Sequence, residues 1–410
     1  MSSIDFIVNP ARKAQGQGFS LADFNPEEAA RIHGFLQSFK EYSQTPLIPM
    51  PNLAKTLGIR LLLVKDESRR FGLNAFKVLG GAWAMGRYLA EKLRLPLEGL
   101  TVDALRAAMD KAKLTDIVFA TATDGNHGRG VAWTAARLGC RAKVFMPKGS
   151  TEIRAANIRA TGADCTITGG NYDDTVRMVA AEAGKNGWVV VQDTAWEGYE
   201  DIPRWIMQGY MTLAVEALEQ MREHTQAIGI TGPSHLFLQA GVGSFAGAVL
   251  GFFAAAMGEA CPVTAIAEPD KADCIFRSIK ANDGKAHVVS GSMNTIMAGL
   301  ACGEPSSISW PVLRDYAAAA ISCPDFIAAN GMRILAAPGN GDIPVVSGES
   351  GALPCGILEY IMRGGGGAPM RKSLGLGSDS TVLLISTEGD TDPDMYNRIV
   401  WRGQYPESID

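Results

Sequence analysis

A lysine at the head of an apolar helical segment is the first residue of the chain that can do chemistry. In the segment 61–89, Lys77 follows a strand-like run and a polar loop, and its neighbours Phe76, Val78 and Leu79 are apolar. Apolar surroundings and a helix N-terminus both disfavour the charged form of an amine, so such a lysine can act as a Schiff-base nucleophile or carry a proton. Taken alone, the pattern is more typical of a lysine whose stem packs along an amphipathic helix.

A polar loop punctuated by glycine, ATATDGNHGRGVA at 120–132, stands between a strand-like run and a helical segment. Because backbone N–H groups point outward at such a turn, the loop can hold a carboxylate while its side chains address the reacting groups. Thr123, Asp124 and Asn126 supply those side chains. A turn in which Asp or Asn caps the next helix explains these residues about as well. His127 by itself is more typical of a packed structural histidine.

A second glycine turn, GVGSFAG at 241–247, follows the strand-like run 235–240 and precedes an apolar helical segment. Glycine allows close approach to the backbone, the amides can donate to phosphate oxygens, and the helix N-terminus adds a favourable field. The residues predicted to bind phosphate are Gly241, Val242, Gly243, Ser244 and Phe245. A dinucleotide fold uses a similar string, but it expects an acidic residue about 20 positions on. Glu268 stands further along the chain than that.

The fourth feature is a strand-like run that ends in two hydroxyl residues. It reads LLISTEGDTDP at 383–393 and contains Ser386 and Thr387. A hydroxyl at the carboxyl end of a buried strand can bond a heteroaromatic nitrogen. By itself the pattern is more typical of a strand that passes into an acidic turn.

Alternating strand-like and helical segments must position these four features. Strand-like runs occur at 117–122, 142–147, 164–169, 188–193, 235–240, 262–269 and 381–389. Repeated β-α-β order implies parallel sheets, with ligands bound outside the carboxyl ends of the strands. We therefore predict an α/β protein with two open, mostly parallel sheets and helices on both faces. The predicted domains are 1–85 plus 194–410, and 86–193.

Length and composition narrow the class of protein. The 410 residues are 47% hydrophobic and 20% charged, which fits a globular chain of two domains. A net charge of −5 gives no general reason to bind nucleic acid or an anionic membrane, so a small-molecule partner is expected. The first residues lack a secretory pattern and the run 246–257 is too short to span a bilayer, so we expect a cytoplasmic protein.

The seven cysteines form no C-x-x-C pair, which argues against a zinc site and a secreted disulfide framework. We expect no metal. One internal disulfide, for example between Cys274 and Cys302, is left open.

In this order the features resemble the pyridoxal-phosphate (PLP) enzymes of fold type II, the tryptophan synthase β-subunit family that also contains threonine deaminase and serine racemase. The resemblance covers most of the chain and is carried by TPL at 45–47, KDES at 65–68, NAFK ending at Lys77, DGNHG at 124–128 and GVGSF at 241–245. It implies pyridoxal 5′-phosphate as cofactor, bound covalently through Lys77, an active site in the cleft between the domains, and a homodimer.

The resemblance also implies roles for the other candidates. Asn126 contacts O3′ of the cofactor, Ser386 places its hydroxyl on the pyridine nitrogen, and the turn at 241–245 holds the phosphate. The residues that bind the substrate are Thr123, Asp124, Gly125 and His127.

One departure from the family pattern narrows the substrate. Most members carry serine before Gly-Asn-His, where this chain has Asp124. Together with Asp124, three longer segments resemble the branch of ammonia-lyases that act on 2,3-diaminopropionate. They are QDTAWEGYEDIP at 192–203, TIMAGLACGEPS at 295–306 and SGESGALPCG at 347–356. The resemblance implies α,β-elimination of both isomers to pyruvate and two ammonia.

If the chain is such an ammonia-lyase, we expect Asp124 to take the α-proton of the D isomer, Asp193 that of the L isomer, and Lys77 to return protons.

The sequence leaves two alternative functions open. Among enzymes, the alternative is a serine or threonine dehydratase, or a β-replacing synthase, on the same cofactor. A non-catalytic nucleotide-binding module, in which Lys77 is only structural, is the alternative from another class.

Overall fold

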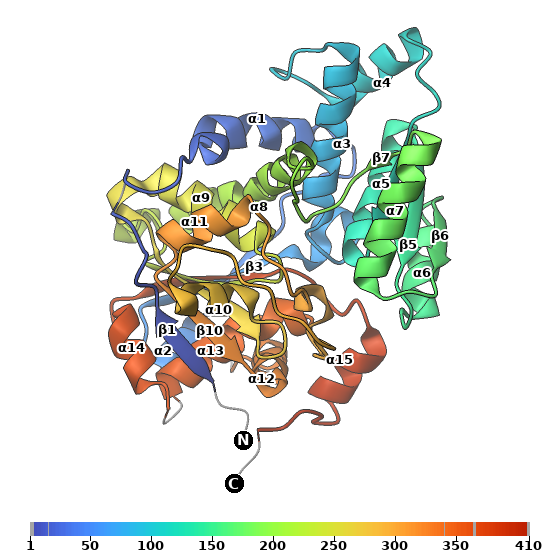
Figure 1. The fold of residues 1–410 in the computed structure, drawn as a ribbon. Coiled ribbons are helices and arrows are strands. Elements are labelled where there is room, and N and C mark those ends of the chain that lie inside the picture. Colours follow the sequence, from blue (N-terminus) through green and yellow to red (C-terminus); the bar gives the residue numbers. More distant parts are fainter. Residues whose placement is uncertain (1–3, 15, 340, 364–365, 408–410) are drawn as a thin grey trace. The chain divides into compact units, whose positions relative to one another are not determined.

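Strand pairing divides the protein into two α/β units. The computed structural model describes residues 4–14, 16–339, 341–363 and 366–407. Packing assigns Met1–Pro26, Gln44–Ala75 and Leu213–Asp410 to the first unit, and Glu27–Ser43 and Phe76–Thr212 to the second. The helix α8 (Asp201–Thr225) begins in the second unit and ends in the first (Figure 1). The domain limits predicted from the sequence, 1–85 plus 194–410 and 86–193, remain a prediction.

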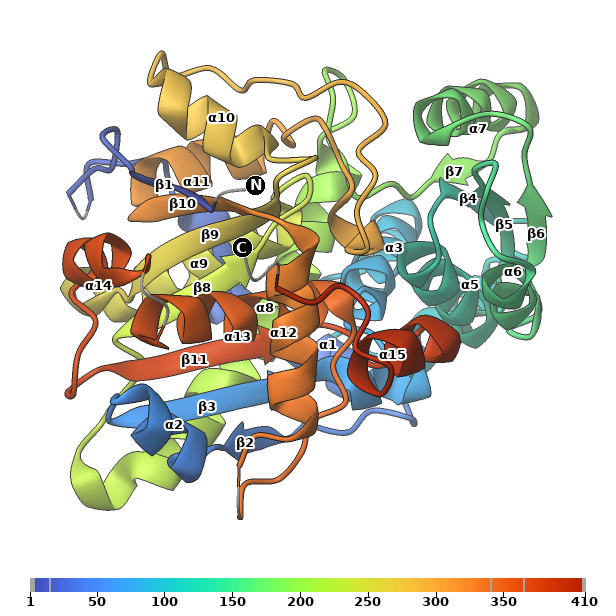
Figure 2. The same ribbon diagram turned by 90° about the horizontal axis from the view of Figure 1, so that it is seen from below.

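The first unit is built on a seven-stranded sheet. Its strands, in spatial order, are β1 (Asp5–Val8), β10 (Ala319–Cys323), β9 (Val263–Pro269), β8 (His235–Gln239), β11 (Thr381–Ser386), β3 (Leu61–Asp66) and β2 (Leu47–Pro49). The inner strands pair in parallel, whereas β1 and β2 pair antiparallel at the two edges. Figure 2 shows β8, β11, β3 and β2 side by side.

Both faces of this sheet are buried, which explains its long apolar runs. The register pairs Leu63 with Leu383 and Val64 with Leu384. Val64 and Leu384 belong to a core shared with α12 (Asp325–Ala336) and α13 (Glu349–Arg363). Leu63 and Leu383 are equally buried and, because side chains alternate along a strand, point to the opposite face.

Shorter helices complete the first unit. They are α2 (Pro51–Leu57), α9 (Ser244–Met257), α10 (Cys274–Ala281), α11 (Ser309–Tyr316), α14 (Ala368–Leu374) and α15 (Pro393–Val400). The 3-10 turns are η1 (Ala22–Phe24), η2 (Glu67–Gly72), η3 (Gln226–Ile228), η4 (Gly258–Ala260) and η5 (Ala298–Leu300).

The second unit holds a four-stranded parallel sheet in the order β6 (Asp164–Ile167), β5 (Arg141–Met146), β4 (Val118–Ala122) and β7 (Val189–Val190). Its helices are α1 (Pro26–Gln37), α3 (Val78–Leu93), α4 (Val102–Lys111), α5 (Asn126–Leu138), α6 (Glu152–Arg159) and α7 (Tyr172–Asn186). In Figure 2, α7 lies on one side of this sheet and α5 and α6 on the other. The predicted fold class, two mostly parallel sheets with helices on both faces, is confirmed.

None of the helices in the described residues is both long enough and apolar enough to span a bilayer.

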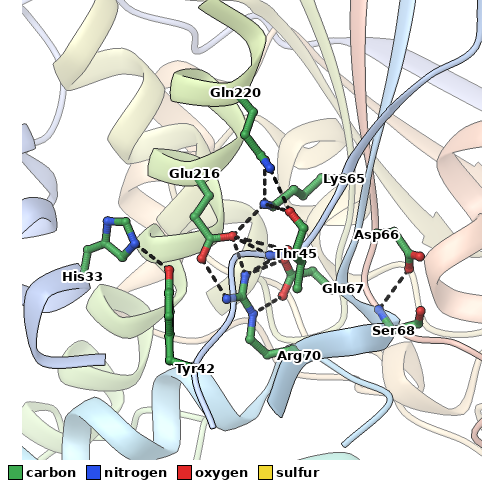
Figure 3. Close-up of polar contacts among 10 residues, drawn as sticks. All are labelled: His33, Tyr42, Thr45, Lys65, Asp66, Glu67, Ser68, Arg70, Glu216 and Gln220. Carbon is green, nitrogen blue, oxygen red and sulfur yellow. Dashed lines mark hydrogen bonds and ion pairs between the residues drawn. The ribbon is translucent and has the colours of Figure 1, made fainter. Parts of the chain in front are cut away.

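A cluster of charged side chains is buried in the first unit (Figure 3). Lys65 and Arg70 face Glu67 and Glu216, and none of the four side chains is more than 1% exposed. The Lys65 Nζ to Glu216 Oε2 distance is 2.6 Å, and Arg70 lies 2.7 Å from Glu216 and 2.8 Å from Glu67. The Thr45 hydroxyl donates to Glu67 over 2.6 Å. Because two cations meet two carboxylates, the cluster ties β3 and η2 to α8 with balanced charge.

We expect Glu216→Gln to lower the free energy of unfolding by about 3–5 kcal/mol, because it leaves Lys65 and Arg70 buried with a single carboxylate. Urea unfolding followed by circular dichroism measures the loss. The control is Glu182→Gln, which removes the same charge from a pair with Lys185 whose side chains are 39% and 71% exposed. That change should cost far less, because solvent screens an exposed pair. Equal losses in the two variants would contradict a stabilising role for the buried cluster.

Candidate active site

In the second unit Lys77 and Asp193 are in direct contact. Lys77 is the N-cap residue of α3, and its Nζ lies 2.8 Å from Asp193 Oδ2. The two side chains are 24% and 10% exposed. Burial alone would raise the pKa of Asp193, but the Lys77 ammonium beside it outweighs burial and holds that pKa below its usual range. Asp193 is therefore a carboxylate that fixes the position of the Lys77 amine.

The loop between β4 and α5 carries the other predicted groups of this unit. The Thr123 hydroxyl oxygen accepts hydrogen bonds from the amides of Gly125 and Gly128, each over 3.0 Å. Gly125 adopts φ +150°, a conformation that favours glycine. Asn126 begins α5. Thr123 thus shapes the loop, because two backbone amides of the loop and the following helix already donate to its hydroxyl.

Asp124 stands in this loop as a partly exposed carboxyl. Burial raises its pKa to about 6, while Lys77 and Arg154 oppose that rise and Asp193 adds to it. In the described part of the chain, no group donates a hydrogen bond to the Asp124 carboxylate. A carboxyl that titrates near neutral pH and has no hydrogen-bond donor of its own is well suited to accept a proton.

The buried polar atoms of the second unit that have no protein partner among the described residues include His127 Nδ1 and the Tyr210 hydroxyl. His127 donates from Nε2 to the carbonyl of Val191 over 2.8 Å, which leaves Nδ1 as an unpaired acceptor. Burial lowers the pKa of His127, so the ring is neutral. The Tyr210 hydroxyl is unpaired as well, and its ring centroid lies 4.7 Å from that of Phe76. Unpaired buried polar atoms are costly, so they indicate a polar ligand or water in this region.

In the first unit the glycine turn and Ser386 lie at the same edge of the sheet. They follow the neighbouring strands β8 and β11, and Gln239 joins the strand ends by donating to the Ile385 carbonyl and the Thr387 hydroxyl over 3.0 and 2.9 Å. Gly243 adopts φ +90°, and a Cβ there would lie 2.8 Å from both Leu313 Cδ1 and Ser309 Oγ. The N-cap residue of α9 is Gly243, which has no side chain to cap the helix. Such a turn suits an anion.

Ser386 lies in a group of small polar side chains. Its hydroxyl donates to Ser347 Oγ over 2.7 Å. Ser350 is three residues from Ser347 in the sequence, and Gln239 lies on β8, the strand beside β11. Ser350 Oγ and Gln239 Oε1 are buried, and neither has a partner among the described residues. Sequence reasoning did not single out Ser347 or Ser350, although both lie in the quoted segment SGESGALPCG.

These residues fit pyridoxal phosphate. The cofactor requires a lysine amine, a cradle of amides for its phosphate and a partner for its ring nitrogen. The second unit contains such an amine in Lys77, and the first unit contains such a turn at 241–245 and a hydroxyl in Ser386. The unpaired buried atoms described above are further support. Cys274 and Cys302 do not form a disulfide, and neither do the other five cysteines.

Comparison with known proteins gives the family. Residues 39–353 match the protein-family model for "Pyridoxal-phosphate dependent enzyme". The chain is 52% identical to diaminopropionate ammonia-lyase of Salmonella typhimurium over 402 residues, which cover 98% of each protein. It is also similar to the crystal structure of diaminopropionate ammonia lyase from Escherichia coli in complex with an aminoacrylate-PLP azomethine reaction intermediate, with TM-score 0.88, 46% identity and 99% of both chains covered.

A further structure of the Escherichia coli enzyme, in complex with D-serine, matches with TM-score 0.89 and 46% identity over 98% of both chains. Because the family model spans most of the chain and these relatives span nearly all of it, the assignment does not depend on a shared fragment. The chain belongs to the PLP-dependent enzymes of fold type II and, within them, to the diaminopropionate ammonia-lyases.

Proposed function

We propose that the protein is a PLP-dependent carbon–nitrogen lyase that converts D- and L-2,3-diaminopropionate to pyruvate and two ammonia. The observation that carries this proposal is the arrangement of Lys77, Asp193 and Asp124, in which one lysine amine shares its surroundings with two carboxylates. The named activity of the relatives from Salmonella typhimurium and Escherichia coli supports it.

Bound PLP supplies an electron sink for the pair released when the α-proton leaves. The residues of the chain have the remaining tasks, which are to orient the substrate, to remove the α-proton and to assist the departure of the β-ammonia. Loss of the α-proton and of the β-amine gives 2-aminoacrylate, and water converts this product to pyruvate and the second ammonia.

Asp124 and Asp193 are the bases in this scheme. We assign the α-proton of the D isomer to Asp124 and that of the L isomer to Asp193. Lys77, whose Nζ lies 2.8 Å from Asp193 Oδ2, returns protons. A carboxylate can also recognise the β-ammonium of diaminopropionate, a charge that serine and threonine lack. Asp124 therefore favours the diamino acid over the substrates of the dehydratases.

Ser386 and the glycine turn hold the cofactor in this proposal, together with Asn126 at O3′. A serine hydroxyl does not ionise at neutral pH, so Ser386 can bond a ring nitrogen without supplying a charge. In the structure Ser386 donates its one O–H to Ser347, so to donate to the ring nitrogen it would instead accept from the Ser347 hydroxyl. A neutral partner at the ring nitrogen favours elimination over transamination. Thr123, Gly125 and His127 complete the proposed substrate-binding loop.

We also propose that the enzyme is a cytoplasmic homodimer that binds a small amino acid and neither nucleic acid nor membrane. The family resemblance supports the dimer. The net charge of −5 and the seven free cysteines support the remaining statements.

Pyruvate release from D-diaminopropionate, L-diaminopropionate, serine and threonine, measured side by side, tests the substrate. We expect both diaminopropionate isomers to be used with a kcat/KM at least about 100-fold above that of serine and threonine, because only they bring a β-ammonium to the Asp124 carboxylate. Faster turnover of serine or threonine would favour the dehydratase. A colourless protein without activity on any of the four would favour the nucleotide-binding alternative.

Lys77→Arg should abolish pyruvate formation and covalent retention of the cofactor, because the guanidinium stays protonated and cannot act as a nucleophile. The absorption spectrum and the mass of the protein after borohydride reduction measure retention. The matched control is Lys92→Arg in the last turn of the same helix. Borohydride-fixed cofactor in Lys77→Arg, or its loss in Lys92→Arg, would refute the assignment of Lys77.

Asp124→Asn removes the proposed base without changing the shape of the side chain. We expect kcat/KM for the D isomer to fall by about 100- to 10,000-fold, the usual range for a general base, and kcat/KM for the L isomer to fall far less. Asp193→Asn should show the opposite pattern. A similar loss for both isomers in Asp124→Asn would rule out the division of labour between the two aspartates.

A further inference from the structure

Arg154 contacts the loop that carries Asp124 but has no role in the scheme above. Its Nη1 donates to the backbone carbonyl of Asp124 over 3.3 Å. A Cβ built on Gly125 would lie 3.4 Å from Arg154 Cδ. The aliphatic stem of Arg154 therefore passes beside Gly125, and its guanidinium lies at the backbone carbonyl of Asp124.

A packed helix delivers this guanidinium. Arg154 belongs to α6, whose Ala155 and Ile158 are fully buried. The Thr151 hydroxyl caps the helix by accepting from the Arg154 amide over 3.4 Å. Since both the backbone and the tip of the side chain have partners, the charge of Arg154 is held near Asp124.

The charged form of Asp124 depends on neighbouring charges. Burial acts against the carboxylate, Asp193 acts in the same direction, and Lys77 and Arg154 favour ionisation. No hydrogen bond to the carboxylate contributes within the described residues. His127, on the same loop, is neutral and adds no charge.

Of the two cations, only Arg154 keeps its charge in every state of the enzyme. A lysine that holds PLP covalently is no longer a free ammonium, and the free Lys77 amine is already paired with Asp193 at 2.8 Å. A guanidinium is not deprotonated in proteins. Arg154 is therefore the cation near Asp124 whose charge does not depend on whether Lys77 is a Schiff base, a neutral amine or an ammonium.

We propose that Arg154 is a positioning residue that keeps the Asp124 carboxylate charged during turnover, and that it thereby sets the pH range in which one isomer of diaminopropionate is used. This inference rests on the proposed role of Asp124 and acts through it. The sign follows from the base mechanism. Without the cation the carboxylate binds its proton more tightly, so the acid side of the pH profile moves to higher pH.

The test compares Arg154→Met, which removes the charge, with Arg154→Lys, which keeps it. Arg177→Met is the matched control, because it removes the same charge from an arginine of the same unit that is 70% exposed. For each variant, kcat/KM is measured against pH with both isomers, and Asp124→Asn first identifies the isomer that depends on Asp124.

We expect Arg154→Met to move the acid limb for the Asp124-dependent isomer upward by about 0.5–1 pH unit. The other isomer should keep its profile, Arg154→Lys should restore most of the shift, and Arg177→Met should change neither isomer. An unchanged limb in Arg154→Met overturns the inference. Equal losses for both isomers without a pH shift also overturn it, since they would mean that Arg154 only shapes the loop.

A second measurement does not need turnover. In a Lys77→Met background, infrared titration of the protonated carboxyl band, assigned with Asp124→Asn, reports the ionisation of Asp124 directly. Adding Arg154→Met should raise its midpoint by a similar amount, and an unchanged midpoint overturns the inference. If the wild-type protein makes no pyruvate from either isomer, the proposed function fails, and the infrared titration still decides the electrostatic role of Arg154.

Discussion

The ion pair between Lys77 and Asp193 constrains the chemistry of the second unit. Its atoms lie 2.8 Å apart, with the Asp193 side chain only 10% exposed, so neither group can lose its partner unless another charge takes its place. Asp124 and Arg154 lie in the same electrostatic field. While Lys77 is a free amine, two cations balance two carboxylates.

The charge of Lys77 is not constant in the proposed reaction, because its amine would exchange between a Schiff base and a free amine, whereas the Arg154 guanidinium stays charged. In that scheme the α-amine of a diamino acid replaces the Lys77 amine, so the β-ammonium is the cation that the substrate keeps. Serine and threonine carry a neutral hydroxyl at that position. A carboxylate such as Asp124 therefore gives a physical reason to favour a diamino acid.

The fold class could be predicted from the sequence because the buried strands β3, β8, β9 and β11 consist of apolar runs. The family could be predicted because recognisable motifs follow several of these runs. The sequence did not reveal β1, which reads DFIV, or β10, which reads AAISC. Short edge strands and strands of small residues are recognised only through their pairing. Arg154 and Tyr210 were not singled out either, since a lone arginine or tyrosine in a helix carries no local signal, and only packing brings it to a site.

The buried cluster in the first unit and the residues around Lys77 differ in how completely their polar atoms are hydrogen-bonded. In the buried cluster Lys65 and Arg70 both bond Glu216, and replacing a member leaves an unpaired charge inside the first unit. Near Lys77, by contrast, Asp124 has no hydrogen-bond donor in the described residues, and the His127 Nδ1 and Tyr210 hydroxyl are unpaired. A fold gains nothing from leaving buried polar atoms unsatisfied. Incomplete bonding, more than charge or burial alone, is thus the feature that separates the residues held for a ligand from those held for the fold.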